Sequence, residues 1–188
     1  MIRFRPEDCR ETGYGFTIEN KVVLLADSAL TFRKHGQLFF CMGGTGAGSG
    51  TWQGDVFLIS LSDGERCRCN REQVVGTLKP ELLPDEAKLQ LSQIRPIGAA
   101  DLDTHAPEYS GYSFLPDGRY ASGVWLCSPE EVKDYVEMQK DYQYRVLICD
   151  RDDFAVMEIV EGKMVFPDEQ ALRECYREHG PDGGMTMA

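Results

Sequence analysis

A glycine-rich stretch, CMGGTGAGSGTWQGD at residues 41–55, has the composition of a loop that contacts a ligand. Successive glycine N–H groups can form a nest for an anion such as phosphate. The stretch lacks the Gly-Lys-Ser/Thr ending of a Walker loop and the G-x-G-x-x-G spacing of a dinucleotide loop, and DVFLISL after it predicts a strand. Three interpretations remain open: a phosphate site, a mobile loop that binds a partner, and a passive connection.

Trp52 favours a loop that binds a partner, because aromatic side chains are common anchors in protein interfaces. The length of the loop also favours function, since long loops within a compact domain are often functional or disordered. The candidate binding residues of the loop are therefore Gly44, Gly46, Gly48 and Trp52.

Cys127 is the thiol best placed for nucleophilic catalysis, because it directly precedes a predicted helix, and a helix N-terminus lowers a thiol pKa. The chain offers only His35, His105 and His179 as an imidazole base, and the sequence connects none of them to Cys127. It also lacks signatures such as G-x-S-x-G or H-E-x-x-H. We therefore expect no catalytic residue.

The segment DLDTH places Asp101, Asp103 and His105 at alternate positions, so an extended chain would direct all three to one side. Carboxylate and imidazole groups can bind a divalent metal. The set is incomplete for a metal-binding loop, and Asp is an ordinary turn residue. We expect no metal or other cofactor, with these three residues as weak candidates.

The net charge of −11 lies entirely in the second half of the chain. Residues 1–100 carry 12 acidic and 12 basic side chains, whereas residues 101–188 carry 19 acidic and 8 basic ones. This charge opposes direct nucleic-acid binding, which depends on basic groups that displace counterions. It favours a basic protein partner or a divalent cation, or it serves solubility alone. Glu130, Glu131 and Asp134 are the candidate contact residues.

The elements expected in the first half are mostly strands. GYGFTI and KVVLLA predict two strands joined by a tight turn, and QLFFCM and DVFLISL predict strands on either side of the glycine-rich stretch. DSALTFRKHG predicts a short helix with Asp27 or Ser28 as its cap and Gly36 at its end. LLPDEAKLQLSQI predicts a second helix with Pro84 near its first position.

The clearest helix prediction is SPEEVKDYVEMQKDY, in the second half. Ser128 is the expected N-cap, Pro129 the first helical residue, and Glu131 completes a capping box. GYSFL and RYASGVWLC before this helix predict strands, as do YRVLICD, FAVMEIV and KMVF after it. DEQALRECYREHG predicts a last helix.

Together these elements predict an α+β protein with mainly antiparallel sheets and three to four helices. We expect an N-terminal α+β half at 1–94 with its glycine-rich loop at 43–54, a connector at 95–111, an acidic C-terminal α+β half at 112–180 and a disordered tail at 181–188. Each half reads as β-β-α-β-β-β-α.

Two local matches between the halves share one offset. YGF at Tyr14 matches YSF at Tyr112, and VFLISLSDG, ending at Gly64, matches FAVMEIVEG, ending at Gly162. Apolar strands followed by a turn with glycine are also common by chance. We hypothesise that the halves, each ββαβββα, arose by duplication and diverged.

The sequence also bears on location. No apolar run approaches the roughly 18 to 20 residues that span a bilayer, and MIRFRPEDCRE lacks the apolar stretch of a signal peptide. The seven cysteines are an odd number without a disulfide-framework spacing, which fits a reducing compartment. We expect a cytoplasmic protein that does not contact a membrane.

The segment SLSDGERCRCNREQVVGTLKPELLPDEAKLQL resembles a segment found in small uncharacterised accessory proteins of bacterial phages and conjugative elements. It covers about a sixth of the chain and contains no catalytic motif, so no functional residue can be transferred. The resemblance implies an accessory role for a mobile element, such as binding a host protein or a protein of the element.

We expect a non-catalytic binding or regulatory protein that acts through protein–protein contacts of its acidic half and its glycine-rich loop. The alternative is a small-molecule or nucleotide-binding protein, which would include an enzyme, with the loop as a lid. A pocket under residues 43–54, lined by polar groups from both halves, would favour this alternative.

Overall fold

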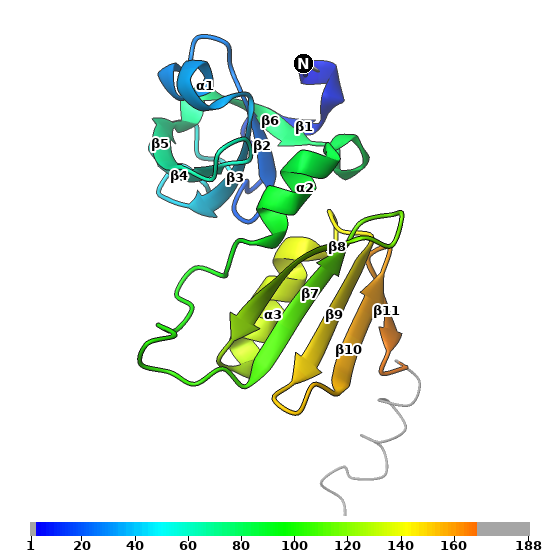
Figure 1. Ribbon diagram of the computed structural model, residues 1–188. Coiled ribbons are helices and arrows are strands. Elements are labelled where there is room, and N and C mark those ends of the chain that lie inside the picture. The colour runs from blue at the N-terminus through cyan, green and yellow to red at the C-terminus, as the bar shows by residue number, and fades with distance from the viewer. Residues whose placement is uncertain (1–2, 169–188) are drawn as a thin grey trace, which may run out of the picture.

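The computed structural model describes residues 3–168, which form two antiparallel β-sheets and three α-helices (Figure 1). None of the described helices has both the length and the apolar composition that a bilayer crossing requires. The α-helices are α1 (Leu30–His35), α2 (Asp85–Ser92) and α3 (Pro129–Gln139). Short 3-10 helices are η1 (Pro6–Asp8), η2 (Arg71–Gln73) and η3 (Pro80–Leu82).

The six-stranded sheet has the spatial order β1-β6-β2-β3-β4-β5, and the five-stranded sheet has the order β11-β10-β9-β7-β8. All neighbouring strands are antiparallel, which confirms the predicted α+β class. The first sheet contains β1 (Cys9–Thr12), β2 (Val22–Leu25), β3 (Leu38–Gly43), β4 (Asp55–Ser60), β5 (Arg66–Asn70) and β6 (Val74–Leu78). The second contains β7 (Tyr109–Phe114), β8 (Tyr120–Leu126), β9 (Arg145–Asp150), β10 (Ala155–Val160) and β11 (Lys163–Phe166).

The central strands of the first sheet are buried on both faces. Val22 and Leu24 of β2, with Phe40 of β3, pack into one apolar cluster, whereas Val23 and Phe39 pack into another on the opposite face. An uninterrupted apolar run such as KVVLLA or QLFFC is typical of a strand buried in this way.

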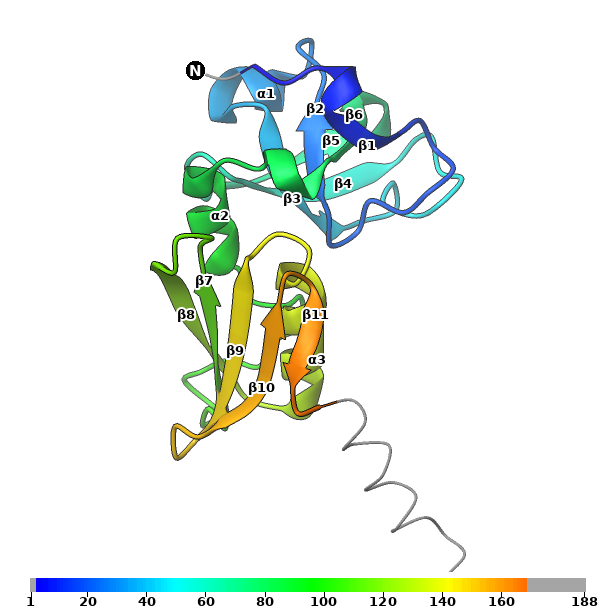
Figure 2. The ribbon, with the colours of Figure 1, turned by 90° about the vertical axis from the view of Figure 1, so that its right-hand side faces the viewer.

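Among residues 3–168, the helix α3 packs on one face of the second sheet. On that face a Cβ at Gly111 would lie 2.5 Å from the Tyr135 ring, and Ser113 Oγ lies 2.9 Å from Tyr135 Oη. Because strand side chains alternate, Tyr112 and Phe114 point to the opposite face. No described helix lies over that opposite face in Figures 1 and 2.

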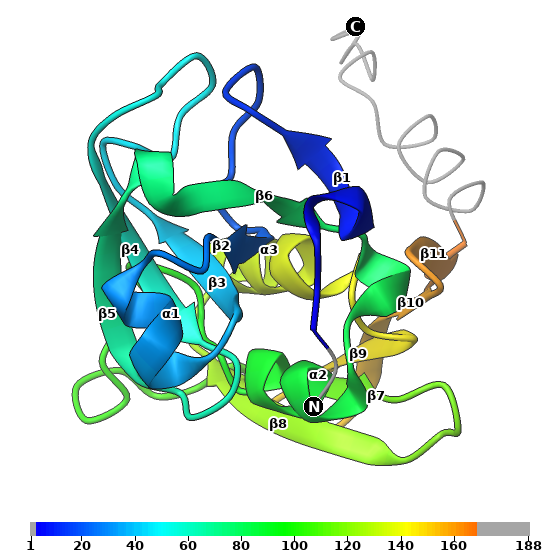
Figure 3. The ribbon, with the colours of Figure 1, turned by 90° about the horizontal axis from the view of Figure 1, so that it is seen from above.

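The two sheets are joined through α2 and α3. In Figure 1, α2 lies between the sheets, and Figure 3 shows β2 and β3 above α3. Tyr142, just after α3, accepts a hydrogen bond of 2.8 Å from the Val22 N–H, and Gln139 Nε2 donates to the Leu91 carbonyl at 3.0 Å. Residues that follow β8 thus complete the core of the first sheet.

Several element predictions need correction. GYGFTI is a loop rather than a strand, and the first strand is instead β1, which pairs with β6. The helix α1 begins only at Leu30, with Ala29 as an N-cap that makes no side-chain hydrogen bond, although Gly36 ends it as expected. The last predicted helix and the tail lie outside the described residues.

The hypothesis of an internal duplication is wrong at the level of strand order. The first strand after α1, β3, pairs with β2, whereas the first strand after α3, β9, pairs with β7 and leaves β8 at the sheet edge. Gly64 and Gly162 both have a φ of 75°, but the turn with Gly64 spans residues 61–65 and the turn with Gly162 spans only residues 161–162. Tyr14 lies in a loop, whereas Tyr112 lies in β7. The shared glycines therefore reflect only the positive φ that many turns require.

Gly111 provides a test of the packing between α3 and the second sheet. Gly111→Ala is expected to lower the free energy of unfolding by about 1–3 kcal/mol, because the added methyl group meets the buried Tyr135 ring. Gly15→Ala is the control, since a Cβ there meets no atom within 4 Å. Urea denaturation measures both, and equal effects would contradict the packing described.

Candidate functional site

The glycine-rich loop between β3 and β4 is tightly packed on itself. A Cβ at Gly44 would lie 2.3 Å from the Asp55 carbonyl oxygen, and one at Gly46 would lie 2.6 Å from that of Gly54. The Gly46 N–H donates to the Asp55 carbonyl at 2.9 Å. Gly44 and Gly46 therefore allow two chain segments to approach more closely than any side chain would permit.

The buried side chain of Arg71 holds this loop in place. Its side chain is fully buried, with Nη2 donating to the Gly13 carbonyl at 2.7 Å and Nε to the Thr51 carbonyl at 3.3 Å. The guanidinium also lies 5.5 Å from the ring centroids of both Tyr14 and Phe16. In residues 3–168 no carboxylate pairs with it, so carbonyl oxygens and aromatic faces stabilise the charge. These contacts favour a fixed loop over a mobile lid.

The remaining predicted contact residues are exposed but dispersed. Gly48 and Trp52 lie on the loop of the first sheet, with 59% of Trp52 exposed, whereas Glu130 and Asp134 lie on α3. Within residues 3–168, no hydrogen bond or ion pair brings these two groups together. They therefore form separate surfaces rather than a common site.

Glu131 is buried, and its predicted role is corrected in two respects. Its carboxylate accepts hydrogen bonds from Arg95 Nη2 at 2.9 Å, the Ala100 N–H at 2.6 Å and the Cys127 N–H at 3.0 Å. Ser128 caps α3, because its side-chain oxygen accepts a hydrogen bond from the Glu131 N–H. The Glu131 carboxylate bonds to the Cys127 N–H and not to that of Ser128, so no capping box forms. With 8% of its surface exposed, Glu131 holds the connector against α3 and is not available as a contact residue.

Asp101, Asp103 and His105 do not converge on a metal site. Asp101 Oδ1 accepts from the Asp103 N–H at 2.9 Å, and His105 Nδ1 lies 2.8 Å from Thr104 Oγ1. Throughout the described part of the chain, no three His, Cys, Asp or Glu side chains are placed to hold a metal ion. The three residues belong to a hydrogen-bonded turn, as the turn preference of Asp indicates.

Cys127 lies beside His105, which the sequence does not connect to it. The thiol donates to the backbone carbonyl of His105 at 3.7 Å, while the imidazole pairs with Thr104. Since the thiol and the ring do not bond to each other, this geometry does not activate a nucleophile.

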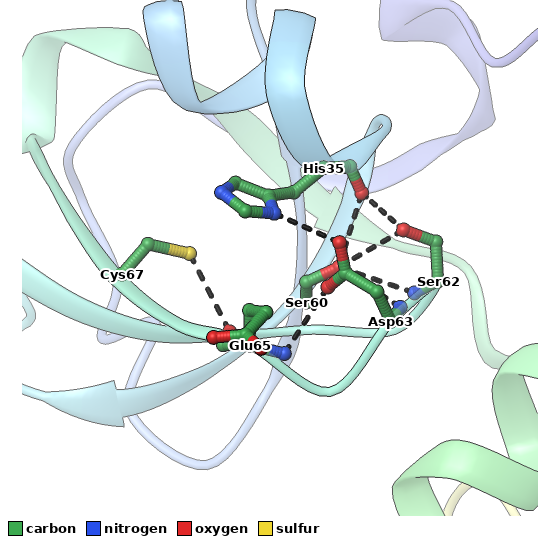
Figure 4. A network of polar contacts seen from close by, with 6 residues as sticks. All are labelled: His35, Ser60, Ser62, Asp63, Glu65 and Cys67. Atoms are coloured by element: carbon green, nitrogen blue, oxygen red, sulfur yellow. Dashed lines mark hydrogen bonds and ion pairs between the residues drawn. The ribbon is translucent and has the colours of Figure 1, made fainter.

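His35 and Asp63 form a pair that resembles part of a catalytic triad (Figure 4). His35 Nδ1 lies 2.8 Å from Asp63 Oδ2, and this hydrogen bond lowers the pKa of Asp63 below its ordinary value. A triad would require a nucleophile on the other ring nitrogen. Instead, the hydroxyls of Ser60 and Ser62 donate to the His35 carbonyl, and the Cys67 thiol donates to a backbone carbonyl. The network thus joins the end of α1 to the β4–β5 turn.

A cleft of about 930 Å³ lies between the first sheet and α2 with the connector that follows it. Its lining includes Gly44, Phe57, Arg66, Gln90 and Arg95. A pocket under residues 43–54 lined by polar groups from both halves would favour the alternative of a small-molecule site, and this cleft meets that description in part. It contacts the start of the loop and contains polar side chains, but its lining ends before the second sheet.

The uncovered face of the second sheet carries a cluster of aromatic side chains. We define the open face as Tyr112, Phe114, Tyr120, Trp125 and Arg145. The Tyr120 ring centroid lies 6.2 Å from that of Tyr112 and 6.1 Å from that of Phe114. Tyr120 is 58% exposed and Trp125 is 55% exposed. Two large aromatic residues are thus exposed on β8, the edge strand of the second sheet.

The side chains of the open face hold one another in position. Arg145 lies 4.8 Å from the Phe114 ring centroid, and its Nε donates to Glu158 at 2.6 Å. Gly123 makes room for the rings, because a Cβ there would lie 2.8 Å from Tyr120 Oη and 3.0 Å from Tyr112 Cδ1. These rings are therefore held in place before any partner binds, which lowers the entropic cost of binding.

Comparison of the chain with models of protein families, with curated proteins and with solved structures finds no match. Two features have the character of binding sites: the open face and the cleft beside α2.

Proposed function

We propose that the protein is a non-catalytic binding protein that engages a partner protein through the open face. The observations that carry this proposal are the packed rings of Tyr112, Phe114 and Tyr120 and the exposure of Tyr120 and of Trp125, which lies further along β8 on the same face. Tyr, Trp and Arg are the residues most enriched at the energetic centres of protein interfaces. Large aromatic side chains grouped on one surface mark interaction sites rather than ordinary solvent-exposed surface.

The electrostatic part of the proposal is a preference for a basic partner, supported by the net charge of −11. The exposed carboxylates of Glu130 and Asp134 contribute to this charge from α3, on the other side of the sheet from the open face. They therefore form a second surface. An accessory role for a mobile element stays a prediction from the resemblance of one segment.

The proposal predicts different effects for two equally exposed tryptophans. Trp125→Ser is expected to weaken partner capture about 30-fold, because it removes an exposed aromatic anchor from the open face. Trp52→Ser, the same change on the glycine-rich loop, is expected to leave capture unchanged. Quantitative capture by the immobilised protein from a lysate of its own cells measures both, with circular dichroism to confirm folding.

Each other outcome has a defined meaning. Equal losses of capture from both substitutions, or a loss from Trp52→Ser alone, would contradict the open face as the contact. The second result would favour the glycine-rich loop as the contact instead. A double variant with Glu130→Lys and Asp134→Lys tests the acidic surface separately. A loss of capture from that variant but not from Trp125→Ser would place the contact on α3.

A further inference from the structure

The cleft beside α2 has the size and the mixed lining of a ligand site. Its volume of about 930 Å³ lies within the roughly 300–1,000 Å³ typical of small-molecule pockets. One wall comes from β3, β4 and β5, and the other from α2 and the connector at residues 95–99. Phe57 and Ile97 line it with large apolar side chains that are 51% and 52% exposed.

The polar lining consists mainly of side chains that can donate hydrogen bonds and that have no protein partner within the described residues. In residues 3–168, the side chains of Arg66, Gln90 and Gln93 form no hydrogen bond or ion pair, although each can donate. Arg95 donates a hydrogen bond from Nη2 to Glu131, while its buried Nε has no partner among these residues. A group that accepts several hydrogen bonds would satisfy these donors, and an anion does so most strongly.

The charges within the cleft are also separated along β4. Glu19, the acidic residue of the lining, lies beside Gly43, which pairs with Phe57. Arg66 instead pairs with Ile59, two residues further along the strand. An anion at the Arg66 end therefore meets a guanidinium that forms no ion pair within residues 3–168, while the apolar side chains extend away from it.

We propose that this cleft binds a small organic anion, in which a carboxylate, sulfonate or phosphate group at Arg66 is joined to an apolar body that lies against Phe57 and Ile97. Gln90 and Gln93 of α2 and its C-terminal cap donate to the anionic group from the opposite wall. The cleft shares no residue with the open face. A negative result for this ligand site would therefore not bear on the proposed protein contact.

A pair of fluorescent probes tests the proposal. The first is 8-anilino-1-naphthalenesulfonate, which combines a sulfonate with an apolar ring system, and the second is N-phenyl-1-naphthylamine, which lacks the sulfonate. Arg66→Gln is expected to raise the dissociation constant of the sulfonate probe at least tenfold and to leave that of the neutral probe unchanged. Both titrations are made in a Trp125→Ser background, so that the open face contributes less signal.

Arg151→Gln is the matched control, because Arg151 is also exposed, lies in the turn between β9 and β10 of the second sheet and does not line the cleft. It is expected to leave both dissociation constants unchanged. An unchanged affinity in Arg66→Gln would overturn the proposal, as would equal losses from Arg66→Gln and Arg151→Gln, which would show only a general effect of charge. The exposed position of Arg66 means that the fold should tolerate the substitution.

Discussion

Glu131→Ala is expected to lower the free energy of unfolding by about 3–5 kcal/mol, as is typical when one partner of a buried ion pair is removed. The substitution leaves the Arg95 guanidinium and the N–H groups of Ala100 and Cys127 without their acceptor. It also releases the connector from the start of α3. Urea denaturation followed by tryptophan fluorescence measures the change.

The neighbouring carboxylate gives the control for this prediction. Glu130 is exposed on the same turn of α3, so Glu130→Ala should change the free energy of unfolding by less than about 0.5 kcal/mol. Similar effects of the two substitutions would mean that the three hydrogen bonds of Glu131 contribute little to stability.

The same carboxylate predicts a pH dependence of stability. Burial alone would raise the pKa of Glu131, but hydrogen bonds from Ala100, Cys127 and Arg95 outweigh it and hold the pKa below the ordinary 4.5. Its contribution to stability is therefore present above about pH 4.5 and is lost as the pH falls through the lowered pKa. Melting temperatures measured from pH 6 to pH 3 should fall less steeply for Glu131→Gln than for the parent protein. Identical slopes would show that this group does not govern acid stability.

Arg71→Met is expected to lower the free energy of unfolding by about 2–4 kcal/mol. It removes two hydrogen bonds from a charged donor, each worth roughly 1.5–3 kcal/mol, while the burial of an unpaired charge that it also removes offsets part of the loss. Methionine keeps the length and the apolar contacts of the side chain. The loss thus reports on the guanidinium itself.

The effect of Arg71→Met should be concentrated in the glycine-rich loop. Amide hydrogen exchange at Gly46 and Gly50, whose N–H groups donate to Asp55 and Tyr14, is expected to accelerate more than exchange in α3. Arg68→Met, at an exposed arginine of β5, provides the control. Unchanged protection of the loop in Arg71→Met would show that other contacts hold it in place.

Much of the fold can be predicted where a segment carries its own signals. The start of α3 follows from Ser128 and Pro129, and the buried strands β2 and β3 follow from uninterrupted apolar runs. By contrast, β1 has the polar sequence CRET and forms through its pairing with β6, which is distant in the sequence. Strand order likewise depends on long-range pairing, so the repeated pattern of elements wrongly suggested a duplication.

The candidate sites were less accessible to prediction because tertiary contacts create them. Glu131 follows a capping-box pattern, yet its acceptor role depends on Arg95 and Ala100, which reach α3 only in the folded chain. Nothing in the sequence marks Arg71 as buried. The alternation that presents Tyr112 and Phe114 to solvent is visible in YSGYSF, but aromatic residues ordinarily suggest the covered side of a strand.

The most direct test of the open face as a protein contact is site-specific photo-crosslinking. We would replace Tyr120 by p-benzoylphenylalanine and, in a second variant, Leu30, which is 63% exposed on α1 of the first sheet. Irradiation in a lysate of the protein's own cells should give a discrete adduct with another protein from the Tyr120 position only, and Trp125→Ser should abolish it. The absence of an adduct, the same adducts from both positions, or an adduct formed only with a second copy of the chain would contradict the account.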